Sequence, residues 1–299
     1  MKKIIISIGL CLVGFVTVAQ NVDEVNNAAF VNKRGVYLLP QAGDFALGID
    51  ASPILGYLGN IFSSSGNYAP DLSSQTIYGK YFLEDNRAIR VKLSLGLFNT
   101  VNKGFVRDDV AYEDDYATDK TVIDVERISN SFVGLNVGYE FRRGSGRVQG
   151  FYGGEVMLGY DGGKNKYDYA NRMNEDNTNP SSFNFDGRNL LPYRVIQSKN
   201  GTFFAGLGAF AGAEYFIAPQ VSLGCEVGLG FIFSSTGKRK TTFEKWDIED
   251  EKAKIQTVKD VSGEKWRNAR NFQVGTYTGN GFFGEYSYSS VSIFLMFHF

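Results

Sequence analysis

Few residues of this chain have side chains suited to acid–base, metal or covalent chemistry. The 299 residues include one histidine, His298, and two cysteines, Cys11 and Cys225. Metal sites built on histidine or cysteine need several such ligands, so the sequence predicts no such site and no bound cofactor. A histidine base is equally improbable as a catalyst, because His298 is the penultimate residue. Carboxylate runs at 114–115 and 249–251 are of a kind that is usually a solvated loop face. The sequence therefore predicts no enzyme.

A second set of chemically active residues consists of nine charged side chains set at alternate positions within apolar segments. Five are acidic and four are basic, so they could neutralise one another as ion pairs or line a charged constriction that selects a small solute. Their arrangement depends on the elements that position them. The nine are Asp50, Lys80, Arg90, Lys92, Glu140, Arg142, Glu155, Glu214 and Glu226.

The elements that carry these charges are β-strands with strict two-residue periodicity. In 221–233 (VSLGCEVGLGFIF) every odd position from Val221 to Phe233 is apolar or cysteine, and every even position but Ile232 is Ser, Gly or Glu. Alternation of this length predicts a strand with one apolar face. Seven further segments follow the pattern, so we expect eight strands. They are 44–51, 75–83, 88–98, 131–142, 148–160, 203–217 and about 285–299.

Connections between these strands alternate between short and long. Short turns are predicted at 84–87, 143–147 and 218–220, and each contains Gly, Pro, Asn or Asp. Long polar connections are predicted at about 52–74, 100–130, 161–202 and 234–284. This alternation around an even number of strands is typical of an up-and-down barrel with both chain ends on one side.

The start of the chain predicts export. Lys2 and Lys3 precede a nearly unbroken apolar run from Ile4 to Val18, and small residues at 17 and 19 suit cleavage after Ala19. We therefore expect a signal peptide at 1–19, a periplasmic lead-in at 20–43 and a barrel at 44–299. Cleavage lowers the formal net charge from −1 to −3 and leaves Cys225 alone, so no internal disulfide is expected. A near-neutral charge gives no support for nucleic-acid or other polyanion binding.

The composition of the two strand faces indicates which one meets lipid. Aromatic residues make up 15% of the chain, the mean hydropathy is −0.19, and the non-apolar strand face is mostly Gly, Ser and isolated charges. A soluble barrel would instead place Lys, Glu and Thr there. We therefore expect the apolar face to contact lipid, with Tyr81, Tyr139 and Tyr215 as an interfacial girdle near the short turns.

Together these features resemble the small eight-stranded outer-membrane β-barrels of Gram-negative bacteria. The resemblance covers about 44–299, and its most specific part is the terminal segment SSVSIFLMFHF, which ends in phenylalanine. It implies an outer-membrane location, contact with outer-membrane lipid, and insertion by the barrel-assembly machinery. That machinery would read an alternating C-terminal signal formed by Val291, Ile293, Leu295, Phe297 and Phe299. Fold likeness of this kind implies no activity.

The nine charges would then point into a lumen only wide enough for side chains. Five bulky aromatic residues share this inward parity, which favours a plugged lumen over a charged constriction for solutes. They are Tyr78, Phe82, Phe132, Phe151 and Phe294.

The long connections hold the remaining candidates for function. Trp246 and Trp266 lie in or beside a mixed-charge stretch, and 53–62 is apolar enough to lie at the membrane interface. Alternation through 121–130 and 242–248 indicates strand pairs that continue past the membrane. We expect a structural or partner-binding role, as an accessory subunit of an outer-membrane complex, with a narrow channel as the alternative and a surface enzyme as a distant third.

Overall fold

The computed structural model describes residues 37–51, 54–55, 74–144, 146–185, 193–259, 270–276 and 291–299. Within these ranges no helix is long and apolar enough to cross a membrane. The elements in these ranges are β1 Phe45–Asp50, β2 Ser74–Glu84, β3 Arg87–Arg107, the short helix α3 Asp109–Asp114, β4 Thr121–Arg143, β5 Val148–Asp168, β6 Tyr193–Ala218, β7 Val221–Thr236, β8 Lys240–Asp247, β9 Lys252–Lys259, β10 Arg270–Thr276 and β11 Val291–His298.

Eight of these strands close into a ring. Strands β1 to β7 each pair with the next, β7 pairs with β11, and β11 pairs with β1, always antiparallel. Strand β10 follows the line of β11 along β7: Thr276 lies opposite Leu229 and Val291 opposite Val227. The predicted eight-stranded antiparallel up-and-down barrel is therefore confirmed.

The two faces of the wall differ as the alternation requires. On β7, Val227, Leu229 and Phe231 point outward, and Leu229 is 60% exposed, whereas Ser222 and Glu226 on the opposite face are buried. Exposed tyrosines stand near the short turns at the positions predicted for a girdle, namely Tyr81, Tyr139 and Tyr215. An apolar exterior around a polar interior inverts the soluble pattern and suits lipid.

Short turns join the strands at one end of the barrel, as predicted. A turn at 85–86 links β2 to β3, and Gly144 takes a positive φ of +118° in the link from β4 to β5. Gln220 takes φ 68° in the two-residue turn before β7. The two terminal strands meet at the same end, where backbone hydrogen bonds join Phe45 and Phe299.

At the other end, the long connections predicted at 100–130, 161–202 and 234–284 contain paired strands over about half of their length. Strands β3 and β4 stay paired to Arg107 and Thr121, and β5 stays paired with β6 as far as Lys166 and Gln197. Hairpin β8–β9, where alternation at 242–248 indicated a strand pair, adds to the edge of β6. The connections are shorter than predicted because cross-strand backbone bonds continue past the apolar wall, where segments such as 161–168 no longer alternate by polarity.

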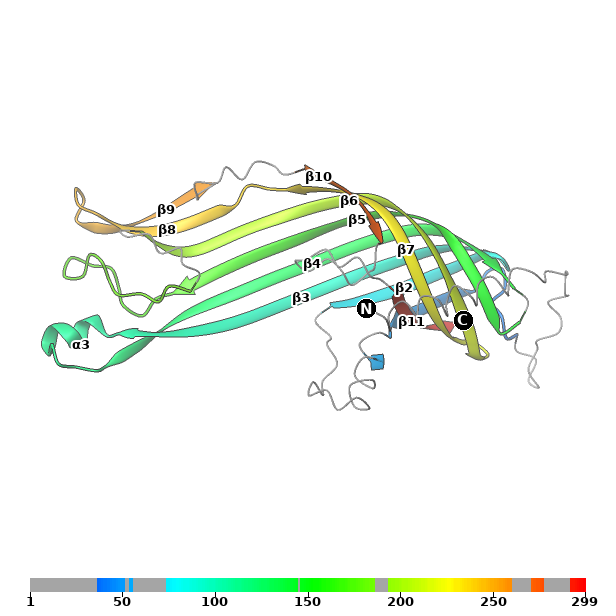
Figure 1. The fold of residues 1–299 in the computed structure, drawn as a ribbon, viewed down its shortest axis with the longest axis horizontal. Coiled ribbons are helices and arrows are strands. Elements are labelled where there is room, and N and C mark those ends of the chain that lie inside the picture. The colour runs from blue at the N-terminus through cyan, green and yellow to red at the C-terminus, as the bar shows by residue number, and fades with distance from the viewer. Residues whose placement is uncertain are drawn as a thin grey trace, which may run out of the picture.

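These parts form a six-stranded sheet that runs away from the ring, on the left in Figure 1, in the order β3-β4-β5-β6-β8-β9. We call it the extension sheet; it comprises 98–107, 121–130, 161–168, 193–202, β8 and β9. Helix α3 lies at its tip. Several predictions fall outside the described residues: the signal peptide, the lead-in up to residue 36, most of 53–62, Trp266 and 285–290.

Candidate functional site: the charged lumen

The nine charged residues singled out by parity all lie inside the barrel. Each is at most 7% exposed, and together they come from seven of the eight ring strands, β1 to β7. Strict alternation brings them there, because inward and outward positions cannot exchange without a register slip. Asp50 lies at the end of β1, opposite Phe294. The other eight belong to one ion-pair network, which we call the lumen network: Lys80, Arg90, Lys92, Glu140, Arg142, Glu155, Glu214 and Glu226.

The half of the lumen network nearer the short turns contains two bases and two acids. Lys80 Nζ lies 3.1 Å from Glu140 Oε1 and 3.2 Å from Glu214 Oε2. Arg142 Nη1 lies 2.9 Å from the same two oxygens. Each carboxylate therefore bridges two cations, an arrangement that offsets much of the cost of removing charges from water.

The other half is built in the same way. Arg90 Nη1 lies 2.7 Å from Glu226 Oε2, and Lys92 Nζ lies 3.0 Å from Glu226 Oε1 and 2.9 Å from Glu155 Oε1. Arg90 Nη1 also lies 3.6 Å from Glu140 Oε2, which connects the two halves. Four positive and four negative charges thus cancel within one interior.

Neutral polar groups supply further hydrogen bonds to this network. Arg142 Nε donates to Gln149 Oε1 at 2.9 Å, and Asn136 Nδ2 donates to Glu155 Oε1 at 2.9 Å. Ser222 Oγ donates to Glu214 Oε1. Such bonds are needed because a buried charge left without partners is strongly destabilising.

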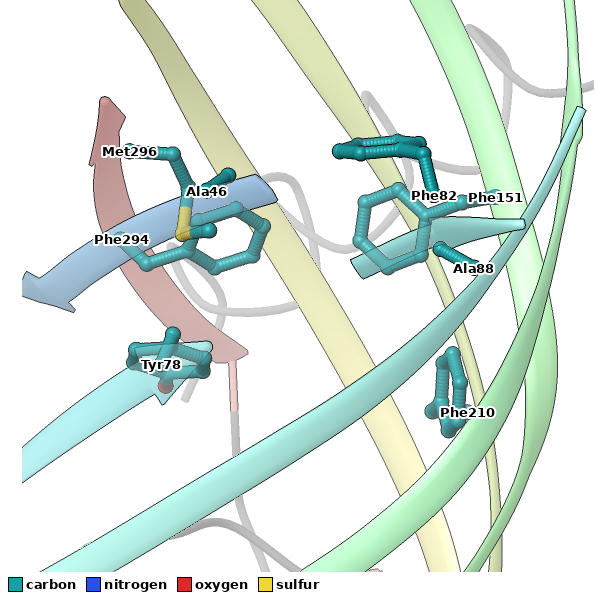
Figure 2. Close-up of a cluster of buried hydrophobic side chains, with 8 residues drawn as sticks. All are labelled: Ala46, Tyr78, Phe82, Ala88, Phe151, Phe210, Phe294 and Met296. Atoms are coloured by element: carbon teal, nitrogen blue, oxygen red, sulfur yellow. The ribbon is translucent and has the colours of Figure 1, made fainter. Parts of the chain in front are cut away.

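Aromatic rings fill the space between the charges. Phe151 and Phe294 pack at 6.0 Å between centroids, and Figure 2 shows both within the cluster that also holds Ala46, Tyr78, Phe82, Ala88, Phe210 and Met296. Lys80 Nζ lies 4.7 Å from the Phe151 centroid, and the Arg90 guanidinium lies 3.7 Å from that of Phe210. These are cation–π contacts, which stabilise a cation away from water.

Glycines on the inner face make room for these rings. A Cβ at Gly212 would lie 2.2 Å from Phe151 Cζ, and a Cβ at Gly224 would lie 2.2 Å from Phe294 Cζ. Farther from the short turns, Phe132 and Phe204 stack at 5.6 Å with their rings 3° from parallel. The five aromatic residues predicted to point inward are all buried.

The histidine forms a cluster that could be mistaken for a catalytic triad. Ser222 Oγ lies 2.9 Å from His298 Nε2, and Glu214 Oε1 lies 3.2 Å from that same nitrogen. A Ser–His–acid relay needs the acid on Nδ1 and the serine on Nε2. Here both partners share Nε2, and all three side chains are buried. This geometry suits packing between Phe82 and Phe216, whose rings both contact His298.

The C-terminal residues predicted to form the assembly signal alternate outward along β11. Phe297 and Phe299 are exposed on the lipid-facing side, Ile293 and Leu295 are half-buried, and the side chain of Val291 lies outside the described residues. Phe299 stacks on Phe45 at 5.1 Å, and each backbone N–H donates to the other residue's carbonyl.

A second ordered cluster, not predicted from the sequence, clamps residues 169–185 onto the extension sheet. Asp109 Oδ2 accepts from the Ser181 N–H at 2.6 Å and from Asn177 Nδ2 at 2.8 Å. Asp124 accepts from the Ala170 N–H at 2.9 Å and the Phe183 N–H at 2.8 Å. The only sequence signal for it was Asp124, which stands at an inward position of the alternating stretch 121–130.

The same cluster extends to hairpin β8–β9. Arg194 Nε donates to Glu244 Oε2 at 2.6 Å, and Arg194 Nη1 donates to the Asn171 carbonyl at 2.8 Å.

Burial alone raises the pKa of Asp109, but hydrogen bonds from Ser181 and Asn177 outweigh it and hold that pKa below its usual value. Among the described residues no three His, Cys, Asp or Glu side chains are grouped so as to hold a metal ion.

Comparison with known proteins gives likeness at the level of the fold. No protein-family model and no curated protein matches the chain. The structure is similar to that of a major outer membrane protein from Thermus thermophilus, with 11% identity and a TM-score of 0.39, over 86% of this chain and 100% of the other. It is also similar to the outer membrane protein OprG from Pseudomonas aeruginosa, with 10% identity and a TM-score of 0.33, over 88% and 98%.

The strand pairing and the apolar wall themselves define the architecture. It is that of a small eight-stranded antiparallel β-barrel with an apolar outer wall.

Proposed function

We propose that this protein is a plugged, non-enzymatic barrel of the outer membrane that anchors an ordered extracellular sheet for partner binding. The observation that carries the proposal is the lumen network: eight charges, each at most 7% exposed, paired with one another and packed among aromatic rings. A path for solutes would need these groups to face water. The barrel therefore acts as an anchor, and function resides in what it displays.

The extension sheet has the features expected of a display platform. Carboxylates of Asp109 and Asp124 clamp 169–185 by their backbone, so the surface is fixed before any partner arrives. Fixed surfaces lose less conformational entropy on binding. Near the tip several apolar side chains are exposed, among them Phe105 (67%), Val110 and Tyr116. Exposed aromatic residues are typical anchors of protein interfaces.

A solute-uptake assay tests the closed lumen. The mature chain would be refolded into vesicles, and swelling in small sugars and amino acids would be followed by light scattering. We expect swelling no faster than that of empty vesicles. Faster swelling with the wild-type protein would contradict a plugged barrel.

Gentle detergent extraction from the native membrane, followed by affinity purification and mass spectrometry, tests the partner role. We expect a stoichiometric membrane partner that is lost from a Phe105→Ser/Tyr116→Ser variant. Ile255→Ser is the matched control, since Ile255 is equally exposed (68%) but lies on hairpin β8–β9. A clean monomer from the wild-type membrane would contradict partner binding.

A narrow channel is the second candidate. Several buried side-chain polar atoms in the described residues lack a hydrogen-bond partner, including Arg90 Nε, Arg142 Nη2 and His298 Nδ1. Groups of this kind would be satisfied by a small polar solute passing between them. Uptake that is abolished by Lys92→Met would favour this candidate.

A further inference from the structure

Four lysines lie side by side across four strands of the extension sheet. In the strand register Lys164 on β5 is opposite Lys199 on β6, Lys199 is opposite Lys240 on β8, and Lys240 is opposite Lys259 on β9. Residues directly opposite in an antiparallel pair share a face, and all four side chains are exposed. We call this set the lysine row.

The lysine row works against the stability of the sheet. Neighbouring strands lie about 4.8 Å apart, and like charges directly opposite each other are destabilising. In the described part of the chain none of the four has a carboxylate within ion-pair distance. The contrast is with Arg127 and Lys166 on the same sheet, which both pair with Asp168. Four like charges in line, with no ion-pair partner among the described residues, favour an anionic ligand from outside the chain.

The position of the row indicates which ligand. Parity along β5 and β6 puts Lys164 and Lys199 on the face that carries Tyr160 and Phe203, the exposed aromatic residues at the far rim of the apolar wall. Four residues along a strand span about 13 Å. With strands tilted by about 40°, Lys164 and Lys199 stand about 10 Å above that rim. Long lysine side chains at this height reach the headgroup layer.

The surface between the rim and the row is kept flat. Gly162 and Gly201 face each other there, and the Tyr160 ring lies over both: a Cβ at Gly201 would be 2.0 Å from Tyr160 Oη. The Tyr160 hydroxyl therefore points from the apolar wall toward the lysines, as expected of a tyrosine at a membrane interface.

We propose that the lysine row binds the phosphate groups of lipid headgroups that surround the extracellular rim of the barrel. Phosphates of packed lipids form a continuous anionic layer, and four cations on neighbouring strands about 4.8 Å apart offer that layer several adjacent contacts. The near-neutral charge of the whole chain conceals this local feature. The inference rests on the membrane placement in the proposed function and is independent of whether the lumen is plugged.

The test uses the full mature chain and two lipids with identical acyl chains, phosphatidic acid and phosphatidylcholine. Native mass spectrometry of the solubilised barrel would measure lipid affinity for the wild type and for K164Q/K199Q/K240Q/K259Q. The matched control is K103Q/K120Q/K245Q/K252Q, which removes the same charge from outside the row. A heat-dependent shift on gels would verify that each variant is folded, and flotation would verify insertion into vesicles.

We expect the wild type to prefer phosphatidic acid, and the row variant to lose about tenfold in affinity for it while the control loses little. Three results would overturn the proposal: an unchanged preference in the row variant, an equal loss in the control, or displacement of the lipid by millimolar inorganic phosphate, which would make the row a site for free phosphate. Wild-type protein that fails to insert would overturn the membrane placement too, whereas insertion without lipid preference would overturn the lysine row alone.

Discussion

Arg90 on β3 and Glu140 on β4 connect the two halves of the lumen network, with Arg90 Nη1 3.6 Å from Glu140 Oε2. Through this contact, cations on β2, β3 and β4 share carboxylates on β4, β5, β6 and β7. The charges therefore tie the barrel together across its interior as well as around its wall. A network of this kind depends on every member, because the loss of one leaves others buried without a partner.

Arg90→Met should destabilise the barrel by about 3–5 kcal/mol, because Glu226 and Glu140 lose a buried cation. Urea unfolding in a defined lipid, followed by tryptophan fluorescence, measures this. Arg87→Met is the control: Arg87 pairs with Glu84 on the surface, and its loss should cost within about 1 kcal/mol. Equal losses at both sites would contradict the energetic role of the lumen network.

Leu229→Lys should destabilise the inserted barrel by about 2–4 kcal/mol, since Leu229 lies on the lipid-facing side of β7. Ile255→Lys makes the same change at a residue that is just as exposed but belongs to the extension sheet, and we expect almost no effect there. Unfolding in vesicles compares the two. Similar costs would mean that the apolar wall has been assigned wrongly.

Deletion of Phe299 should slow insertion into lipid and lower stability by about 2 kcal/mol. The deletion removes two backbone hydrogen bonds and a stacked ring from the point where β1 meets the terminus. Folding kinetics into vesicles would measure the effect, and Phe299→Tyr, which keeps backbone and ring, should fold normally. Normal insertion of the deletion variant would remove Phe299 from the assembly signal.

The clamp formed by Asp109 should loosen in acid. The pKa of Asp109 is lowered in the folded protein. Its ionised carboxylate therefore stabilises the clamp at pH values above the unfolded pKa of about 3.9, and this stabilisation is lost as the pH falls through the folded pKa. Hydrogen exchange at the Ser181 amide, corrected for intrinsic rates, should show protection at neutral pH that declines below about pH 4.

Asp109→Asn is the control for this pH dependence. An amide cannot titrate, so Ser181 should exchange faster than in the wild type at neutral pH and should lack the acid step. A wild-type profile that stays flat down to about pH 2 would show that Asp109 does not hold the loop.

Sequence alone predicted the barrel because lipid contact imposes strict alternation. Leu229 and Glu226 differ in parity, and parity alone determines which of them faces the lumen. The pairing of the charges could not be predicted from the sequence. Lys80 and Glu140 are 60 residues apart, and only the register of β2, β3 and β4 brings Lys80 Nζ within 3.1 Å of Glu140 Oε1.

The extension sheet was underestimated for the same physical reason. Strands such as 161–168 (DGGKNKYD) show no alternation in polarity, so the sequence gives no sign that the pairing of β5 continues past the apolar wall. The lysine row is likewise invisible in sequence, because Lys164 and Lys259 come together only through the pairing of β8 with β6.

Single-channel recording in planar bilayers tests the central claim, a plugged lumen, most directly. The wild-type barrel should insert without resolved conductance steps. An Arg90→Ser/Glu226→Ser variant removes a cation and its partner from the lumen network and should conduct. Its conductance would show that the recording detects inserted barrels. Stable, resolved steps from the pure wild-type protein would contradict the plugged barrel and favour the narrow channel.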